Sequence, residues 1–276
     1  MPWQANLSLD YRAERGRTVL RHQHDGPLRI LKSLYPEGDA ICHSVIVHPP
    51  GGLVGGDTLD IQVRVGEGAH GFISTPGATR FYASDEAVAT QRVRIELEAG
   101  ARLEWLPLEA IAYPGCRGRN HWQASLAEGA EMLAWDVTAL GLPRAGQPFS
   151  NGRFEQHLCI PGLWLEQAQI DATDQRLLNS PLGLGGLRCM GSLLFAAGSE
   201  LTRERREALL EVVREALAGA ADGVRVAATC PNGRMLVVRA VAPLVEPLMG
   251  SLQSVWGALR PAAWGMVAQA PRIWRV

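Results

Sequence analysis

The chain has 276 residues, of which 47% are hydrophobic and 20% charged, and a formal net charge of −1 at pH 7; this permits one large globular domain or two small ones. The charge balance argues against nucleic acid or an anionic membrane as a partner, and neither a signal-peptide pattern nor an apolar run of roughly 20 residues indicates membrane insertion. Five scattered cysteines without a C-x-x-C pair argue against a disulfide framework and a structural zinc site, so we expect a reduced, cytoplasmic protein.

The first expected strands carry residues that could bind a metal. In RHQHD, His22 and His24 are two residues apart and share one face of a strand, with Asp25 beside them. In ICHSVIVH, Cys42 and His43 are adjacent and would face opposite sides of a strand. None of these spacings indicates a closed tetrahedral site, and each residue taken alone is more often an ordinary core or surface residue.

The segment HPPGGLVGGD is a glycine-rich loop that ends in a carboxylate. It lacks the lysine and hydroxyl of a P-loop, and its glycines do not have the G-x-G-x-x-G spacing of dinucleotide-binding folds. We therefore do not expect it to bind a nucleotide. The residues of this motif are His48, Pro49, Pro50, Gly51, Gly52, Gly55, Gly56 and Asp57.

From residue 5 to about 195, short alternating runs separated by Gly, Pro, Asn and Asp predict a mainly β structure. Three segments resemble one another: VRVGEGAHGFIST, IELEAGARLEWLP and ASLAEGAEMLAWD. Their Gly-Ala turns begin at Gly68, Gly100 and Gly129, and a weaker fourth copy surrounds residues 161–162. A period of about 30 residues predicts stacked strand units, as in a β-solenoid, a β-helix or a sandwich. An antiparallel meander would also place hairpins at such intervals.

Carboxylates follow two of the repeat turns. Seven residues beyond the repeat glycines lie Thr75, Pro107 and Asp136, which would line up along one side of a stacked fold. Glu109 and Asp136 lie in apolar surroundings, and we expect both to come close to Asp57. Buried carboxylates are costly unless they are paired, hydrogen-bonded or facing water. A row of them in a wet passage would suit a weakly held divalent cation; the simpler alternative is that Asp57 and Asp136 accept backbone N–H bonds in tight turns.

A helical region follows the β-rich repeats. Residues 199–217 predict an amphipathic helix that Ser199 or Thr202 could cap. A strand pair around VRVAATC and RMLVVRAVA comes next, joined by a turn at residues 231–233. A second, proline-interrupted helix is expected over about residues 243–259.

Three tryptophans are concentrated near the C-terminus: Trp256, Trp264 and Trp274. We interpret them as core residues, although exposed tryptophans would indicate a partner surface. No linker separates this region from the repeats. We therefore expect a single domain over residues 1–276, with the stacked strands over about 1–198 and a helix–strand–helix addition over about 199–276.

Several motifs occur in the order found in one known family. They are GPLRILKSLYPEG at 26–38, ICHSVIVHPPGGLVGGDTL at 41–59, ISTPGATRFYAS at 73–84, EWLPLEAIAYPG at 104–115 and AWDVTALGLPRAGQPFSNG at 134–152. The chain resembles the urease accessory protein UreD (also called UreH) over essentially its whole length. The combination HPPGG-x-x-GGD with ST-x-x-AT-x-x-Y, which includes Thr75 and Tyr82, is specific to that family.

This resemblance implies a protein that is not an enzyme, with a largely β, solenoid-like fold and a few helices. It implies a complex with the helical accessory protein UreF and the GTPase UreG, which docks on apo-urease and supplies nickel through an internal passage. Nickel would be passed on and not tightly bound. We expect Asp57, Glu109 and Asp136 to line the passage, with Cys42 and His43 as softer nickel contacts. The glycine-rich loop would let strands approach closely and present its carboxylate to the passage.

Two other classes of function stay open at this point. A β-solenoid carbohydrate-active hydrolase would use two of Asp57, Glu109 and Asp136 as acid and base. Aromatic residues, which usually line the groove of such an enzyme, make up only 6% of the chain. A plain interaction scaffold would bind partners without any contact with metal.

Overall fold

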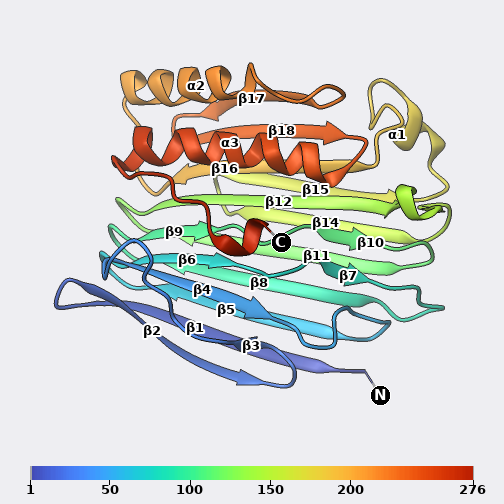
Figure 1. The fold of residues 1–276 in the computed structure, drawn as a ribbon, viewed down its shortest axis with the longest axis horizontal. Coiled ribbons are helices and arrows are strands. Elements are labelled where there is room, and N and C mark those ends of the chain that lie inside the picture. Colours follow the sequence, from blue (N-terminus) through green and yellow to red (C-terminus); the bar gives the residue numbers. More distant parts are fainter. Residues whose placement is uncertain (1, 276) are drawn as a thin grey trace.

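The computed structural model describes residues 2–275, which form two β-sheets and a layer of helices (Figure 1). The smaller sheet has seven strands, in the spatial order β15 (Trp164–Asp171), β14 (Arg153–Ile160), β11 (Arg117–Leu126), β8 (Ala89–Leu97), β5 (Thr58–Val65), β1 (Gln4–Glu14) and β2 (Arg17–Asp25). The larger sheet runs β17 (Arg225–Asn232), β18 (Met235–Ala242), β16 (Cys189–Ala197), β12 (Glu131–Leu142), β9 (Arg102–Trp105), β6 (His70–Ser74), β4 (Ile41–Val47) and β3 (Arg29–Ile30). Strands β7 (Thr79–Phe81), β10 (Ala110–Ala112) and β13 (Gln147–Pro148) extend the larger sheet beside this path.

The helices are concentrated at the C-terminal side of the chain. They are α1 (Gln175–Asn179), α2 (Arg203–Leu217) and α3 (Val245–Trp264), with short 3-10 turns at Pro143–Ala145 and Arg272–Arg275. Helices α2 and α3 lie side by side over one face of the larger sheet (Figure 1). No helix within the described residues has the length and apolar character needed to cross a membrane.

The repeat predicted from the sequence is a set of stacked coils, and the mainly β, solenoid expectation is confirmed. In each coil the chain leaves a strand of the smaller sheet, turns at a glycine and enters the larger sheet, as from β5 to β6, β8 to β9 and β11 to β12. The three turn glycines, Gly68, Gly100 and Gly129, have φ values of 65°, 64° and 70°. These left-handed values favour glycine. Neighbouring turns are also bonded: Gly68 N–H donates to Ala99 O at 3.3 Å.

The weak fourth repeat copy does not form another coil. Gly162 has the expected positive φ of 72°, but the chain returns within the same sheet. Strand β15 pairs antiparallel with β14, and Ile160 lies opposite Trp164. The prediction of a fourth stacked unit at residues 161–162 is therefore wrong, because a turn sequence does not determine which strand the chain pairs with next.

Two buried clusters hold the three layers together. Between the sheets, Ile61, Val93 and Trp122 are register partners on successive coils and are each at most 3% exposed. On the other face of the larger sheet, Phe72 and Trp135 belong to a second cluster that includes residues of α2 and α3. Burying a large apolar side chain contributes roughly 1.5–3 kcal/mol, so both interfaces are substantial.

The C-terminal helices differ in detail from the predicted ones. Thr202, and not Ser199, caps α2: its Oγ1 accepts a hydrogen bond from Arg205 N–H at 3.2 Å. Ser199 Oγ instead accepts from the N–H of the repeat turn residue Gly129 at 2.9 Å. Helix α3 continues five residues beyond the predicted end and stops at Gly265, whose φ is 65°. Helix α1 was not predicted.

The tryptophans near the C-terminus pack into the core, as predicted. Trp256 is 2% exposed and Trp264 is 9% exposed. Their indole N–H groups donate to Glu104 and Glu131, respectively, each at 2.6 Å. Trp274 packs against the Trp256 ring at a centroid distance of 5.0 Å.

Candidate functional site

A row of amide side chains crosses the interior between the two sheets. Gln91 in β8, Asn120 in β11 and Gln156 in β14 occupy one register position on three neighbouring parallel strands. All three point to the inner face, where most other positions are apolar. Asn120 and Gln156 are each 3% exposed. The coils therefore place one amide above the next in an otherwise apolar core.

Asp136 joins this row from the opposite sheet. Asn120 Nδ2 donates to Asp136 Oδ2 at 2.8 Å, and Gln156 Nε2 donates to Asp136 Oδ1 at 2.6 Å. Gln91 Nε2 donates to Asn120 Oδ1 at 3.2 Å. At the end of the row, Thr79 Oγ1 donates to Gln91 Oε1 at 3.5 Å. The result is a continuous chain of hydrogen-bonded side chains; we call Gln91, Asn120, Asp136 and Gln156 the polar row.

The carboxyl group of Asp136 is held at an energetic cost. It is 7% exposed, and burial raises its pKa to about 6, although the bonds from Gln156 and Asn120 act in the opposite direction. The nearby carboxylate Glu166 raises it further. A carboxylate whose pKa is raised by burial together with a charged neighbour, and which lies beside a cavity, is a candidate functional group.

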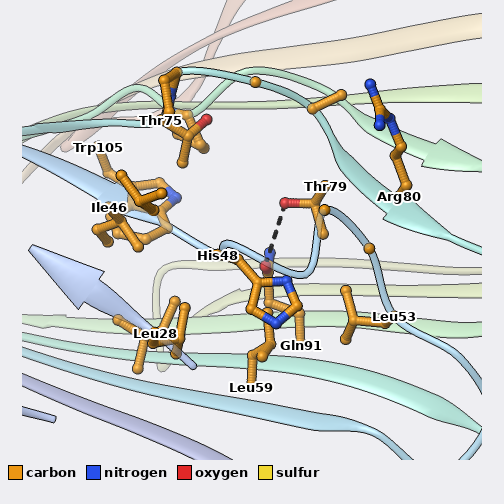
Figure 2. Close-up of a pocket in the computed structure, with 18 residues that line it drawn as sticks. Leu28, Ile46, His48, Leu53, Leu59, Thr75, Thr79, Arg80, Gln91 and Trp105 are labelled. Carbon is orange, nitrogen blue, oxygen red and sulfur yellow. Dashed lines mark hydrogen bonds between the residues drawn. The ribbon is translucent and has the colours of Figure 1, made fainter. Parts of the chain in front are cut away.

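Cavities lie at both ends of the polar row. The first has a volume of about 180 Å³. Gln91, Thr75 and Thr79 line it together with His48 and glycines of the HPPGGLVGGD loop, and Figure 2 shows His48 beside Gln91 and the hydrogen-bonded Thr79. This first cavity is large enough to hold ordered water next to these polar groups.

The second cavity has a volume of about 510 Å³ and is lined by the other end of the row, Gln156. Glu166, Ser192 and Arg239 also line it. Ser192 Oγ donates to both carboxylate oxygens of Glu166 at 3.2 Å, and Arg239 Nη2 lies 3.0 Å from Glu166 Oε2. Burial raises the pKa of Glu166, which Arg239 counteracts. This cavity therefore contains a second partly buried carboxylate close to the row.

Two buried oxygen atoms near Asp136 have no hydrogen-bond partner among the described residues: Gln156 Oε1 and Thr138 Oγ1. Thr138 lies two residues after Asp136 on β12, so both side chains face the same side. Buried polar atoms without a partner are rare and costly, and water or an ion normally satisfies them. Carboxylate, amide and hydroxyl oxygens would together suit a hydrated divalent cation.

Thr75, Pro107 and Asp136 each lie two residues beyond positions that are paired across three successive coils. Ile73 pairs with Trp105, and Trp105 pairs with Ala134. The next pair, Ala110 with Thr138, is one residue out of that register. Thr75 Oγ1 accepts a hydrogen bond from Leu108 N–H at 2.9 Å. The connections after the repeats therefore lie side by side at the edge of the first cavity and the polar row.

The Asp57 carboxylate accepts backbone hydrogen bonds at the turn in which it lies. Its Oδ1 accepts from Trp3 N–H at 2.7 Å, its Oδ2 accepts from Val54 N–H at 2.9 Å, and its side chain is buried. This is the simpler alternative raised from the sequence. The loop glycines permit close packing: a Cβ added at Gly52 would lie 2.3 Å from a ring carbon of Tyr82.

The expectation that Asp57, Glu109 and Asp136 would lie close together is wrong. Glu109 follows β9, and its pKa is raised by burial and further by the charge of Glu246. Neither of the other two carboxylates is among the groups that affect it. Across residues 2–275, no three His, Cys, Asp or Glu side chains are grouped so that they could hold a metal ion. The sequence pattern located each carboxylate next to a strand but not its distance from the others.

Cys42 and His43 face opposite sides of β4, as expected. Cys42 is fully buried between the two sheets. His43 faces the helices, stacks on Phe72 at a centroid distance of 4.2 Å and has its Nε2 2.8 Å from Glu37 Oε1. The two residues therefore have different surroundings and do not act as one metal site.

A buried charge network lies between the larger sheet and α3. Arg260 and Glu104 are both 0% exposed. Arg260 Nη2 donates to Glu104 Oε1 at 3.0 Å, and its Nη1 donates to Glu37 Oε2 at 2.6 Å. Burial alone would raise the pKa of Glu104, but His70 and Arg260 together hold it below its usual value. This network fixes α3 on the sheet through groups far apart in the sequence.

Most of the polar row is not predicted from the sequence, although the sequence carries one signal for it. Gln91 and Asn120 each stand nine residues before a repeat glycine, at Gly100 and Gly129. A polar residue at the same place in two copies of a repeat indicates a position that faces its equivalents. For Glu104 and Arg260 the sequence carries no such signal, because they are 156 residues apart and belong to different layers.

The fold and the site together define a β-solenoid scaffold with a polar path through its interior. A family model described as UreD urease accessory protein matches residues 4–275. The chain is 60% identical to the urease accessory protein UreD of Albidiferax ferrireducens and 57% identical to that of Variovorax paradoxus, in each case over 99% of both chains. Identity to the protein of the same name from Leptothrix cholodnii is 47% over the full length of both.

The chain therefore belongs to the UreD urease accessory protein family. Proteins of this family act in the maturation of urease and are not catalysts. The interpretation of the carboxylates as the acid and base of a carbohydrate-active hydrolase is accordingly wrong.

Proposed function

We propose that this chain binds apo-urease together with UreF and UreG and conducts Ni(II) toward the urease active site through the space between its two sheets. Membership of the UreD family supports the urease partner. The observation that carries the passage is the polar row, which links two cavities through an apolar core. A stacked fold that served only as a scaffold would not require a buried carboxylate and three amides along one line.

The side chains of the row suit transfer better than storage. Carboxylate and amide oxygens and water are weaker ligands for Ni(II) than thiolate or imidazole, so an ion held by them exchanges readily. Asp136 supplies the full negative charge near the middle of the row, and Gln156 Oε1 and Thr138 Oγ1 supply oxygen atoms that have no hydrogen-bond partner within residues 2–275. A path must bind its ion strongly enough to admit it and weakly enough to release it.

Variants of the row test this function in the assembled complex. We expect Asp136→Asn and Gln156→Leu to co-purify with UreF, UreG and apo-urease in wild-type yield, while the matured urease contains less nickel. Both changes keep the volume of the side chain and remove oxygen ligands. Metal analysis of purified urease, with urease activity as a second readout, gives the result.

Glu98→Gln is the matched control, because Glu98 is exposed on the outer face and pairs there with Arg64. Urease matured with this variant should be fully loaded. Full nickel loading with both row variants would overturn the passage. Failure of the wild-type chain to co-purify with its partners would overturn the complex.

A further inference from the structure

We propose that His121 and His157 form a binding site for a borderline divalent metal ion, such as Ni(II) or Cu(II), on the outer face of the smaller sheet. Strands β11 and β14 are parallel neighbours, and the register places His121 directly beside His157. Both side chains are half-buried. They point away from the polar row, because Asn120 and Gln156, one residue earlier on each strand, point inward.

The two rings are separated by a distance that one metal ion can bridge. Their centroids are 5.3 Å apart, and the ring planes are tilted by 48°. Imidazole nitrogens bind such metals at about 2.1 Å, so two rings on one ion at tetrahedral or octahedral angles have centroids roughly 4.5–5.5 Å apart. Small side-chain rotations would therefore bring one nitrogen of each ring to the same ion. The outer face leaves the remaining positions open to water.

The surrounding charges do not prevent a cation from approaching. Arg119, one row away, pairs with Glu155 at 2.8 Å. Arg92, beside His121 in the register, pairs with Asp60 at 3.1 Å. The remaining side chains next to the pair on this face are those of Gln123, Cys159 and Gln167. Arg94, beside Gln123, lies 3.4 Å from the same Asp60. Each nearby guanidinium therefore has a carboxylate partner, with Asp60 shared between two of them.

The pairing of two histidines is itself informative. Like charges directly opposite one another in a sheet are destabilising, so this pair would repel if both rings were protonated. A metal ion binds the neutral forms and makes the close pairing favourable. No third His, Cys, Asp or Glu joins the pair in a metal-holding group within the described residues, so the site has two protein ligands and is completed by water. Such a site exchanges its ion readily.

Metal binding to the full-length chain tests the site without any urease assay. Equilibrium dialysis with Ni(II) at pH 7.5 should show that the single variants His121→Gln and His157→Gln each remove the same equivalent of bound metal. Cu(II) bound at that equivalent should show two coupled imidazole nitrogens by electron paramagnetic resonance. Glutamine keeps a polar side chain on the solvent face, so the fold should be retained, and an unchanged melting temperature checks this.

The double variant His22→Gln/His24→Gln is the matched control, because it removes two histidines whose ring centroids are 6.3 Å apart at the sheet edge. It should leave this equivalent bound, and so should Cys159→Ser. Loss of the equivalent in either control, or its retention in His121→Gln and His157→Gln, would overturn the proposal. Nickel loading of urease is not part of this test, so its result is independent of the passage.

Discussion

Replacing Asp136 with asparagine should make the chain more stable at alkaline pH. The ordinary pKa of 3.8 is raised to about 6, chiefly by burial. The folded state therefore binds the carboxyl proton more tightly than the unfolded state. The resulting stabilisation of the folded state is complete below pH 3.8 and is lost as the pH rises through 6. A difference of about two pKa units corresponds to about 3 kcal/mol. Asparagine has no charge to bury, and Gln156 can turn its free Oε1 to accept the new amide N–H.

Urea denaturation of both chains at pH 8 and pH 4 measures this difference. We expect Asp136→Asn to increase the free energy of unfolding by about 3 kcal/mol at pH 8 and by less than about 1 kcal/mol at pH 4. Asp171→Asn is the control, because bonds from Thr173 and Arg153 lower the pKa of Asp171 to about 2, so its replacement should not stabilise at pH 8. A gain for Asp136→Asn that is equal at both pH values, or a loss at pH 8, would refute the reasoning.

Two further predictions concern packing around the site. Arg260→Met should lower the free energy of unfolding by about 3–5 kcal/mol, because it leaves Glu104 buried without its cation; a loss below about 1 kcal/mol in urea denaturation would contradict the network. Gly52→Ala should destabilise by about 1–3 kcal/mol, since its Cβ would lie 2.3 Å from the Tyr82 ring. Gly77→Ala, which has open space around it, is the comparison, and equal melting temperatures for the two variants would show that the close approach is not needed.

The fold was predictable where local sequence determines local geometry. Gly68, Gly100 and Gly129 recur because each turn between the sheets needs a left-handed residue, so their spacing reports the coil length. Gly162 has the same left-handed conformation, yet at this turn the chain forms a hairpin within one sheet. Whether a strand crosses to the other sheet depends on which edge is free to pair, and that is a non-local property. Turn residues therefore predict where the chain bends but not where it goes.

The site was predictable only in part for a similar reason. Asp136 attracts notice because a carboxylate in an apolar run needs partners. Its actual partners, Asn120 and Gln156, lie in polar-alternating strands where inward and outward positions look alike until the register is known. Glu109 is notable for the same reason and Asp57 because it ends a glycine-rich loop, but neither contacts the polar row: Asp57 accepts backbone N–H bonds from Trp3 and Val54. Sequence shows which groups are costly to bury, whereas the register shows which of them meet.

The buried pair of Glu104 and Arg260 also affects the order in which the chain can fold during synthesis. Arg260 is made 156 residues after Glu104, so the nascent larger sheet exists first without its counter-charge. Its outer face, including Phe72 and Trp135, is uncovered until α3 arrives. Exposed apolar surface of this kind favours aggregation and recruits chaperones. The last helix therefore completes this cluster: a chain that ends before it lacks Arg260 and leaves Phe72 and Trp135 without the cover of α3.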